Sequence, residues 1–484
     1  MAWRSILSFG SLLGLALAAA LWFVAPEDQI LALSQEAWIA VAAGSLLVCA
    51  GMFPAVAGGC SLPSARLDRI GLAGLAGWGI LALVSALQAG RFSSGSASGA
   101  TAVSCAVLGV WVALGGAQGR HLVAWIGVAP VSGMAVALWR WAGAFLPRVL
   151  EEGGIWREAY ASASFDLNSF PLPSKNLAGL AGAMALAFCA GVWDRRAPRS
   201  ARRGILLLGA AGGLAVAASG GEAAAVGLGA GLLGAFARRL GARRSLALGA
   251  VAALALGSWG FASGLMDRHA FRVRTLARAG RVTLGAPWLG HGPGSFFGAF
   301  DSPDPSGGAP GEVYALEGSS TRVTHAHSLP LQIAVEAGWP CALALGVAVA
   351  VALLSVRRDS GPEARVRDGV RGALAAWAVA SLFGAEGSLP IALLWGSCGT
   401  GFLCSGGRAG GATAVPGSLR APLPASARVL LVLAGSALAW EGGIRPASAL
   451  RALAPRASVL RGGDSLAPAR GAVALPDPVA EQAV

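Results

Sequence analysis

Long apolar runs separated by short polar segments dominate the chain. Windows of about 20 apolar residues, enough to cross a bilayer as a helix, predict the spans 5–24, 36–55, 70–90, 100–118, 121–146, 176–193, 204–219, 221–237, 245–265, 329–356, 369–386, 388–405 and, as an optional last span, 427–441. No alternating ten-residue strands typical of a membrane β-barrel occur in the sequence. The pattern predicts an all-α integral membrane protein, a polytopic bundle of 12 or 13 transmembrane helices.

The segments between these spans alternate in charge. One set of connections gathers most of the basic residues: Arg4, Arg66, Arg69, Arg120, the runs 194–203, 238–244 and 357–371, and Arg408, Arg420 and Arg428. The short turns on the other side carry almost no positive charge. By the positive-inside rule the basic side, with the N-terminus, is cytoplasmic. We therefore expect a multi-pass membrane protein whose N-terminus faces the cytoplasm.

The composition agrees with this membrane architecture. Hydrophobic residues make up 55% of the 484 residues and charged residues only 13%, against about 25% charged residues in soluble domains. The 71 glycines favour close packing between helices. The seven cysteines show no CxxC pattern and no Cys/His spacing typical of a metal site, so we interpret them as small hydrophobic residues. The N-terminal segment resembles a signal peptide and is interpreted as an uncleaved first span.

The order of the spans suggests four regions. Residues 1–170 form N-terminal transmembrane helices, and residues 171–405 form a transmembrane core that contains a long outer loop, 266–328. Residues 406–441 hold a linker and the optional last span. Residues 442–484, rich in Ala, Pro, Arg and Gly, lack periodicity and are expected to be disordered.

The outer loop begins with a basic amphipathic segment, 268–281. It places apolar side chains on one face and arginines on another: Phe271, Leu276 and Ala279 toward lipid, and Arg274, Arg278 and Arg281 at i, i+4 and i+7. Such a helix can lie on anionic lipid headgroups. Alternatively, its guanidinium groups can bind the phosphates of a phosphorylated lipid.

A glycine-rich run follows at 287–300. Gly290, Gly292 and Gly294 would let backbone N–H groups approach an anion closely. The alternative is a flexible loop between two interfacial elements. The run does not indicate a dinucleotide site, because no strand precedes it.

The end of the loop places titratable groups at the mouth of the span 329–356. Arg322, His325 and His327 come first, then Ser328 as an N-cap and Pro330 in the first turn, so that Gln332 and Glu336 share one helical face inside the membrane. Ionisable groups there indicate function. A neutral imidazole can take a proton from a hydroxyl, and arginines with the positive helix end can hold a diphosphate. Gln332 or Glu336 could orient the helix mouth or bind sugar hydroxyls.

This chemistry indicates glycosyl transfer from a polyprenyl-diphosphate sugar on the outer leaflet. No Asp-rich metal motif and no nucleotide-sugar motif occurs, which fits a lipid-carried donor and predicts a reaction without metal or other cofactor. The expected partners are the lipid-linked oligosaccharide, a hydroxyl acceptor and membrane lipids; no nucleic acid is expected.

These motifs resemble those of the O-antigen ligase and polymerase superfamily, whose signature is His, then Asn, Ser or Gln, nine residues and Gly-x-x-Gly. His327, Ser328 and Gly338 match it, while Cys341 replaces the second glycine. Three further segments are similar: E-x-G at 336–338, P-x-x-G-x-G-x-G-x-F at 287–296, and the helix opening at 175–180. The resemblance covers roughly residues 170–405.

The resemblance implies a GT-C-like fold and a metal-independent transferase acting in lipopolysaccharide and other cell-envelope polysaccharide synthesis. It gives the general-base role to His327 and diphosphate binding to Arg274 or Arg272, with Arg322 as a further candidate. We expect Glu336 to be the second catalytic residue and His325 and Gln332 to join in binding the diphosphate. The family's S-R-G turn is replaced by Ser219–Gly220–Gly221–Glu222, which lacks the arginine.

Other readings stay open. A transporter or flippase of a lipid-linked saccharide is the alternative from another class, although its usual midplane charges and inverted repeats are not evident. Within the transferases, the sequence does not separate a ligase, a chain polymerase and a protein O-glycosyltransferase, whose acceptors are lipid A–core, a glycan and a protein hydroxyl.

Overall fold

The computed structural model describes residues 65–89, 99–114, 175–219, 221–241, 270–302, 325–355, 362–383 and 389–405, with residues 426–434 and 436–438 and isolated helical positions at 39–47, 138–145 and 244–248. Several sequence predictions therefore lie outside the described residues: the spans 5–24, 36–55, 121–146 and 245–265 in whole or in large part, Arg322, and the tail 442–484.

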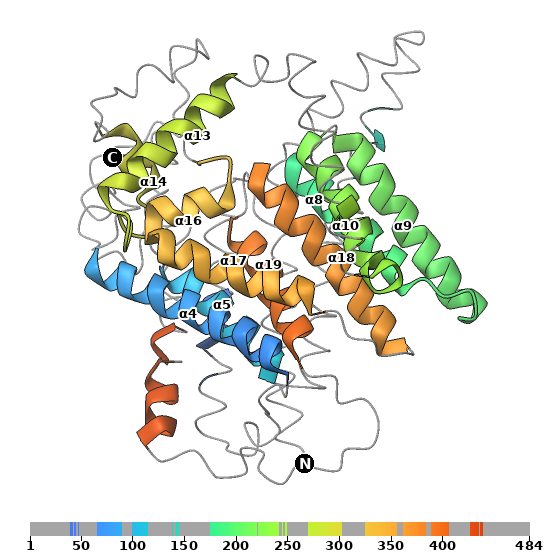
Figure 1. Cartoon of the computed structure of the whole chain (residues 1–484), viewed down its shortest axis with the longest axis horizontal. Helices are drawn as coiled ribbons and strands as arrows, with labels where there is room; N and C mark the ends of the chain where they lie inside the picture. Colours follow the sequence, from blue (N-terminus) through green and yellow to red (C-terminus); the bar gives the residue numbers. More distant parts are fainter. Residues whose placement is uncertain are drawn as a thin grey trace, which may run out of the picture.

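The described chain is helical, and no strand occurs within it. In chain order its elements are α4 (Arg66–Gln88), α5 (Gly99–Leu114), α8 (Lys175–Val192), α9 (Arg199–Ser219), α10 (Glu222–Leu240), α13 (Ala270–Val282), the 3₁₀ turn η2 (Thr283–Gly285), α14 (Phe296–Asp301), α16 (Leu329–Ala337), α17 (Trp339–Leu354), α18 (Pro362–Phe383) and α19 (Leu389–Cys404) (Figure 1).

Three of these helices, α4, α9 and α10, are long and apolar enough to cross a membrane. Shorter apolar helices include most of α5, α8 and α17. Described helices also occupy the positions of the spans predicted at 70–90, 100–118, 176–193, 204–219, 221–237, 369–386 and 388–405. The chain thus has the helical, apolar character of an all-α membrane protein.

One predicted span is wrong in its continuity. The segment 329–356 was expected to be a single helix, whereas the structure divides it into α16 and α17. Gly338 separates them with φ of +85°, a backbone conformation that glycine adopts without the steric cost of a Cβ. Figure 1 shows the two helices meeting there with a change of direction. Gln332 and Glu336 therefore lie on a separate nine-residue helix.

Small residues bring the helices close together, as the glycine content predicts. Gly182 of α8 faces Gly212 of α9, and a Cβ added to either glycine would collide with the other's carbonyl oxygen. Gly231 of α10 similarly lies against α8 and α18, near Ala187 and Ala376. Such contacts replace side-chain burial with close backbone packing, which suits helices in an apolar solvent.

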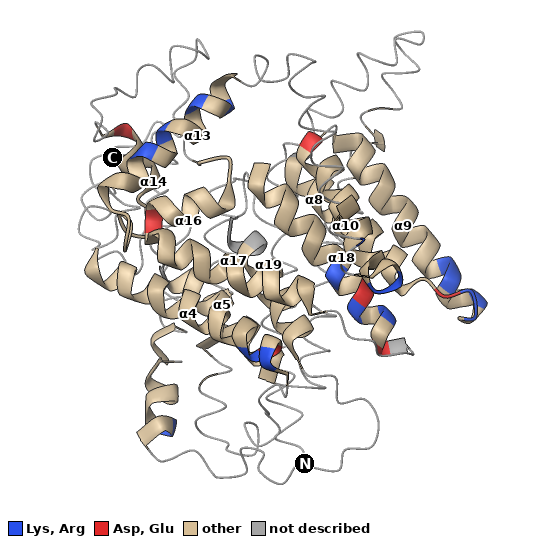
Figure 2. Cartoon of the chain, viewed as in Figure 1, with Lys and Arg blue, Asp and Glu red and all other residues tan. Residues whose placement is uncertain are grey.

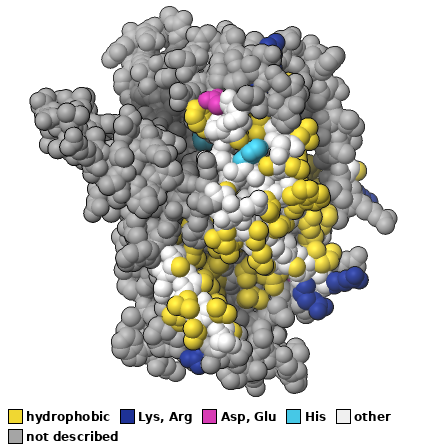
Figure 3. Space-filling view, turned by 90° about the vertical axis from the view of Figure 1, so that its left-hand side faces the viewer, with side chains coloured by type: hydrophobic (Ala, Val, Ile, Leu, Met, Phe, Trp, Pro, Cys, Tyr) yellow, Lys and Arg dark blue, Asp and Glu magenta, His cyan; other side chains and the backbone are white. Residues whose placement is uncertain are grey.

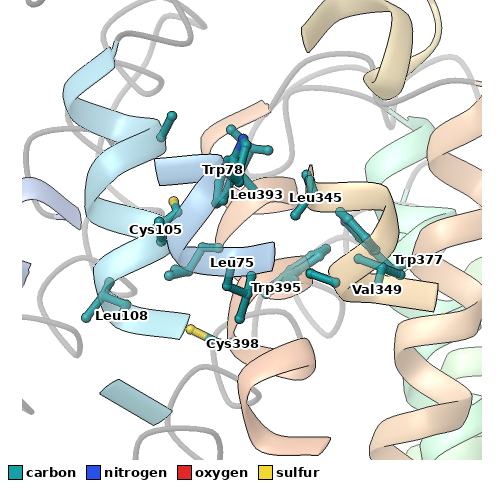
Figure 4. Packing of buried hydrophobic residues seen from close by; sticks show 14 of the residues in the cluster. Leu75, Trp78, Cys105, Leu108, Leu345, Val349, Trp377, Leu393, Trp395 and Cys398 are labelled. Carbon is teal, nitrogen blue, oxygen red and sulfur yellow. The ribbon is translucent and has the colours of Figure 1, made fainter. Parts of the chain in front are cut away.

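A single hydrophobic cluster joins α4 and α5 to the later helices. It includes Trp78, Cys105, Leu345, Trp377 and Trp395, one each from α4, α5, α17, α18 and α19 (Figure 4). Helices on both sides of the boundary predicted at residue 170 therefore share one core, and that boundary stays a sequence-based prediction.

Buried charges tie the helices together at one end, which we call the charged end. Asp368 accepts hydrogen bonds from Arg238 Nε at 2.8 Å and from Arg371 Nη1 at 3.1 Å, and Arg371 Nη2 donates to the carbonyl oxygen of Ser355 at 3.0 Å. The hydroxyl of Ser355 in turn donates to Asp68 at 2.6 Å. These bonds link α4, α10, α18 and the end of α17.

The basic runs at 194–203, 238–244 and 357–371 have described residues at this same end, where α9 and α18 begin and α10 finishes (Figure 2). Arg365 of α18 pairs there with Asp194, just after α8. The described residues of these three runs thus gather at one end, whereas the arginines of α13 lie at the opposite end. The opposite end, where α8 starts and α13, α14 and α16 lie, is called the histidine end below.

Candidate functional site

His327 lies in a tight turn directly before α16. Its φ of +53° is the only positive value at a non-glycine position among the described residues. The imidazole is half-buried, and its edge faces the ring of Phe271 on α13, with 6.0 Å between ring centroids. His325 is also half-buried, while Ala326 between them is buried. The structure thus brings both predicted histidines to the contact between α13 and α16.

Gln332 and Glu336 form a hydrogen-bonded pair on α16, as their i, i+4 spacing predicts. Gln332 Nε2 donates to Glu336 Oε1 at 2.6 Å, and Gln332 Oε1 accepts the backbone N–H of Ala326 at 2.8 Å. Each of the two side chains is only 4% exposed. The pair therefore faces the protein interior and holds the turn that carries the histidines.

The predicted start of this helix is confirmed in position. Ser328 occupies the N-cap with extended backbone angles, and Pro330 lies in the first turn. The Ser328 side chain makes no capping bond, however; its carbonyl oxygen accepts the N–H of Gln332 at 2.8 Å.

The glycine-rich run packs against the C-terminal end of α16. His291 N–H donates to the Val335 carbonyl at 2.9 Å, and Gly292 N–H donates to the Glu336 carbonyl at 2.8 Å. Trp339 N–H returns a bond to the Pro287 carbonyl at 2.9 Å. A helix end leaves carbonyl groups without intrahelical partners, and this loop supplies donors to two of them.

Two glycines make this docking possible. Gly290 and Gly338 both have positive φ, and a Cβ at Gly290 would collide with the backbone of Glu336, while a Cβ at Gly338 would collide with the backbone of Trp288. The two sequence motifs P-x-x-G-x-G-x-G-x-F and E-x-G therefore meet as the two sides of one contact. The N–H groups of Gly290 and Gly292 are engaged here, with Ala286 and Glu336, rather than directed at an anion. Gly294, the third glycine of the predicted cradle, also has positive φ.

The basic helix α13 matches the predicted segment, but its arginines have different environments. Arg274 is exposed and Arg272 half-buried. Arg278 is only 1% exposed: its guanidinium donates to the Phe300 carbonyl at 2.7 and 2.9 Å and to the Ser302 carbonyl at 2.7 Å, and it lies over the Phe300 ring.

The expectation that Arg278 belongs to an exposed basic face is therefore wrong, because this side chain fastens α13 to α14. The expectation that Ala279 faces lipid is also wrong. Ala279 is fully buried in a small cluster with Val282, Phe296 and Phe300, against which Phe271 packs.

The start of α8 and the turn between α9 and α10 also lie at the histidine end. α8 begins at Lys175, and α9 and α10 meet at the predicted turn, where the N–H of Gly221 donates to Ser219 Oγ at 3.1 Å. A Cβ on Gly221 would touch both Ser219 and Asn176, so the turn lies beside the start of α8.

The sequence did not indicate the contacts that two further side chains make in this region. Ser85, near the end of α4, donates to the Leu289 carbonyl at 2.6 Å and the Glu336 carbonyl at 3.2 Å. The His291 ring lies 3.2 Å from the carbonyl oxygen of Val282 through Nε2. A single hydroxyl within the apolar run 70–90 was the available signal for Ser85.

Among the described residues, no group of three or more His, Cys, Asp and Glu side chains is placed to hold a metal ion. In comparisons with known proteins, neither a protein-family model nor a curated protein sequence matches the chain.

Proposed function

We propose that this chain is a membrane glycosyltransferase of the O-antigen ligase and polymerase type. It would transfer a glycan from a polyprenyl-diphosphate carrier to a hydroxyl group at the outer face of the bacterial inner membrane. The observation that carries the proposal is the histidine turn: a half-buried imidazole against Phe271 of the basic helix α13, in a turn whose Ala326 N–H is bound by the buried Gln332–Glu336 pair.

In the proposed reaction His327 takes the proton of the acceptor hydroxyl. The oxygen forms a bond to the anomeric carbon of the donor sugar as the bond from that carbon to the diphosphate breaks. The polyprenyl diphosphate leaves with the bonding electron pair, and the imidazolium releases its proton to water. The chemistry is substitution at carbon with an anionic leaving group, so cations near the leaving group stabilise the transition state.

Arg274 and Arg272 are the proposed partners of the diphosphate. Both follow Phe271, the residue that faces His327, by no more than one helical turn, about 5 Å along the axis. The exposed guanidinium of Arg274 is open to a ligand, and the planar group can bind phosphate oxygens in pairs. Arg322, outside the described residues, remains a third candidate.

Surface apolar residues support a position at the membrane boundary. Trp288 is 76% and Leu284 67% exposed, and Trp339, which donates through Nε1 to Thr283 Oγ1 at 3.2 Å, is partly exposed beside them. Tryptophans gather at the headgroup level of bilayers. Figure 3 shows hydrophobic side chains around and below a histidine on one face of the molecule. The charged end, rich in arginine, would then lie in the cytoplasm.

A transporter or flippase of a lipid-linked saccharide is the second candidate, favoured by the break between α16 and α17. Discontinuous helices often bind substrate or ions in transporters. Here the carbonyls of Val335 and Glu336 next to the break already accept bonds from the glycine-rich run. We therefore prefer the transferase.

Reconstitution distinguishes the two candidates. Purified protein in proteoliposomes would receive a labelled polyprenyl-diphosphate oligosaccharide and a panel of acceptors (lipid A–core, a glycan and an acceptor protein) in the presence of EDTA. The proposal expects product with one acceptor class from the wild type and none from His327→Ala, at equal protein abundance. Movement of labelled lipid across the bilayer without product would instead support the transporter.

A further inference from the structure

The side chains of Gln332 and Glu336 are buried, away from the surface that a substrate would approach. Both are 4% exposed; they bind each other through Gln332 Nε2 and Glu336 Oε1, and Gln332 Oε1 binds the main chain of Ala326. The half-buried imidazole of His327, by contrast, is partly accessible. The polar pair therefore lies deeper in the protein than the imidazole. The two are connected through Ala326, which binds Gln332 through its N–H and directly precedes His327.

We infer that Gln332 and Glu336 are positioning residues that hold His327 in its active conformation, an inference that rests on the function proposed above. Glu336 orients the amide of Gln332, and Gln332 Oε1 in turn fixes the N–H of Ala326, the residue before His327. The pair takes no part in proton transfer and does not bind the diphosphate. This assigns them roles different from those expected of a catalytic glutamate and a diphosphate-binding glutamine.

The backbone of His327 shows why such a device is needed. A non-glycine residue at φ of +53° is strained by about 1–3 kcal/mol, and it persists only where its surroundings hold it there. The contacts that hold it here include the bond from the Ala326 N–H to Gln332 and the ring of Phe271 against the imidazole. Without the first contact the turn can relax to a more common conformation, and the imidazole moves with it.

Glu336 also connects the histidine turn to the glycine-rich run. Its side chain holds Gln332, whereas its main-chain carbonyl accepts the N–H of Gly292 and the hydroxyl of Ser85. A change of the side chain alone therefore disturbs the histidine turn and leaves the docking of the loop in place. This separation makes the inference testable by substitution.

Glu336→Gln is the decisive variant. Its amide oxygen still accepts the bond from Gln332 Nε2, so a positioning role expects kcat within about threefold of wild type. Glu336→Ala and Gln332→Ala remove the support and should lower kcat about 10- to 100-fold, the cost of a small misplacement, while KM for the donor changes little. Loss of activity in Glu336→Gln equal to that in Glu336→Ala would overturn the inference in favour of proton transfer by the carboxyl group. A large rise in KM for the donor in Gln332→Ala would overturn it in favour of diphosphate binding.

Hydrogen exchange gives a readout that needs no activity. The amide of Ala326 should exchange faster in Gln332→Ala and Glu336→Ala than in wild type, and at the wild-type rate in Glu336→Gln and in the control Gln88→Ala, an exposed glutamine at the end of α4. Unchanged exchange in Gln332→Ala would overturn the inference. If the exchange results hold while the wild type transfers no glycan, the proposed function fails and the positioning of the turn stands.

Discussion

The charged end and the histidine end both bury polar side chains between helices, but they use them differently. At the charged end the carboxylate of Asp368 forms ion pairs with Arg238 and with Arg371. At the histidine end the buried amide of Gln332 binds the carboxyl group of Glu336 and the main chain of Ala326. The first arrangement joins whole helices, and the second holds one short turn.

Polar groups thus stabilise the fold at the charged end and shape a site at the histidine end. A buried ion pair is costly to break, because the partner left behind is a desolvated charge. A single buried hydrogen bond contributes only about 0.5–1.5 kcal/mol to stability, yet the bond from the Ala326 N–H to Gln332 supports the turn that carries the imidazole. We therefore expect substitutions in the ion network of the charged end to reduce mainly stability, and substitutions of Gln332 or Glu336 to reduce mainly activity.

Asp368→Ala should have the largest effect on stability. It leaves the buried guanidinium of Arg371 and that of Arg238 without their shared carboxylate, at a cost of about 3–5 kcal/mol. Thermal unfolding in detergent measures the loss. The control Asp194→Ala removes a more exposed partner of Arg365 and should cost about 0–1 kcal/mol. Equal losses from the two variants would contradict the role given to the charged end.

Gly338→Ala should come next. The substitution forces a Cβ against the backbone of Trp288 at a position of positive φ, where strain alone costs about 1–3 kcal/mol. We expect the glycine-rich run to detach from α16, seen as faster protease cleavage within residues 286–295. Gly346→Ala, at a helical position with open space around it, is the matched control and should be neutral or stabilising. Slow cleavage in both variants would show that the two motifs do not depend on each other.

Arg274→Ala should weaken donor binding about tenfold, which corresponds to about 1.4 kcal/mol, with little change in unfolding temperature, because the side chain is exposed. The effect should shrink as salt is added, since screening weakens exposed charges. The dissociation constant of a polyprenyl diphosphate, measured at several salt concentrations with the protein in nanodiscs, reports this loss. Arg199→Ala, an exposed arginine at the charged end, serves as control, and equal losses would refute the placement of the diphosphate.

Ser85→Ala should have the smallest effect. It removes the bonds to the carbonyls of Leu289 and Glu336, worth about 0.5–1.5 kcal/mol, and should lower the unfolding temperature by a few degrees. Ser104→Ala is the control, because the buried Ser104 hydroxyl has no hydrogen-bond partner among the residues that the structure describes. A larger loss from Ser104→Ala than from Ser85→Ala would contradict the anchoring of the glycine-rich run to α4.

Much of the helical framework could be predicted from the sequence, because hydropathy and arginine placement are local signals. The turn between α9 and α10, for example, falls where the span boundaries put it. The break at Gly338 could not be predicted, because it depends on a partner loop nearly fifty residues earlier in the chain, around Gly290.

The site shows the same division. The i, i+4 spacing of Gln332 and Glu336 predicts that they share a face, but only the fold reveals that this face is turned inward to Ala326. Likewise, the periodicity of α13 groups Arg278 with Arg274, whereas the fold takes Arg278 into contact with Phe300. Spacing locates residues on a helix, and tertiary packing decides which of them meet a ligand.

The proposed function requires that the charged end and the histidine end lie on opposite sides of the membrane. Side-specific cysteine labelling tests this placement most directly. Arg274→Cys and Arg199→Cys would be treated with a membrane-impermeant maleimide in intact cells and after permeabilisation, with the unsubstituted chain as background; its five described cysteines are buried. We predict that position 274 is labelled in intact cells and position 199 only after permeabilisation. Labelling of both positions from the same side, or in the reverse order, would contradict the account.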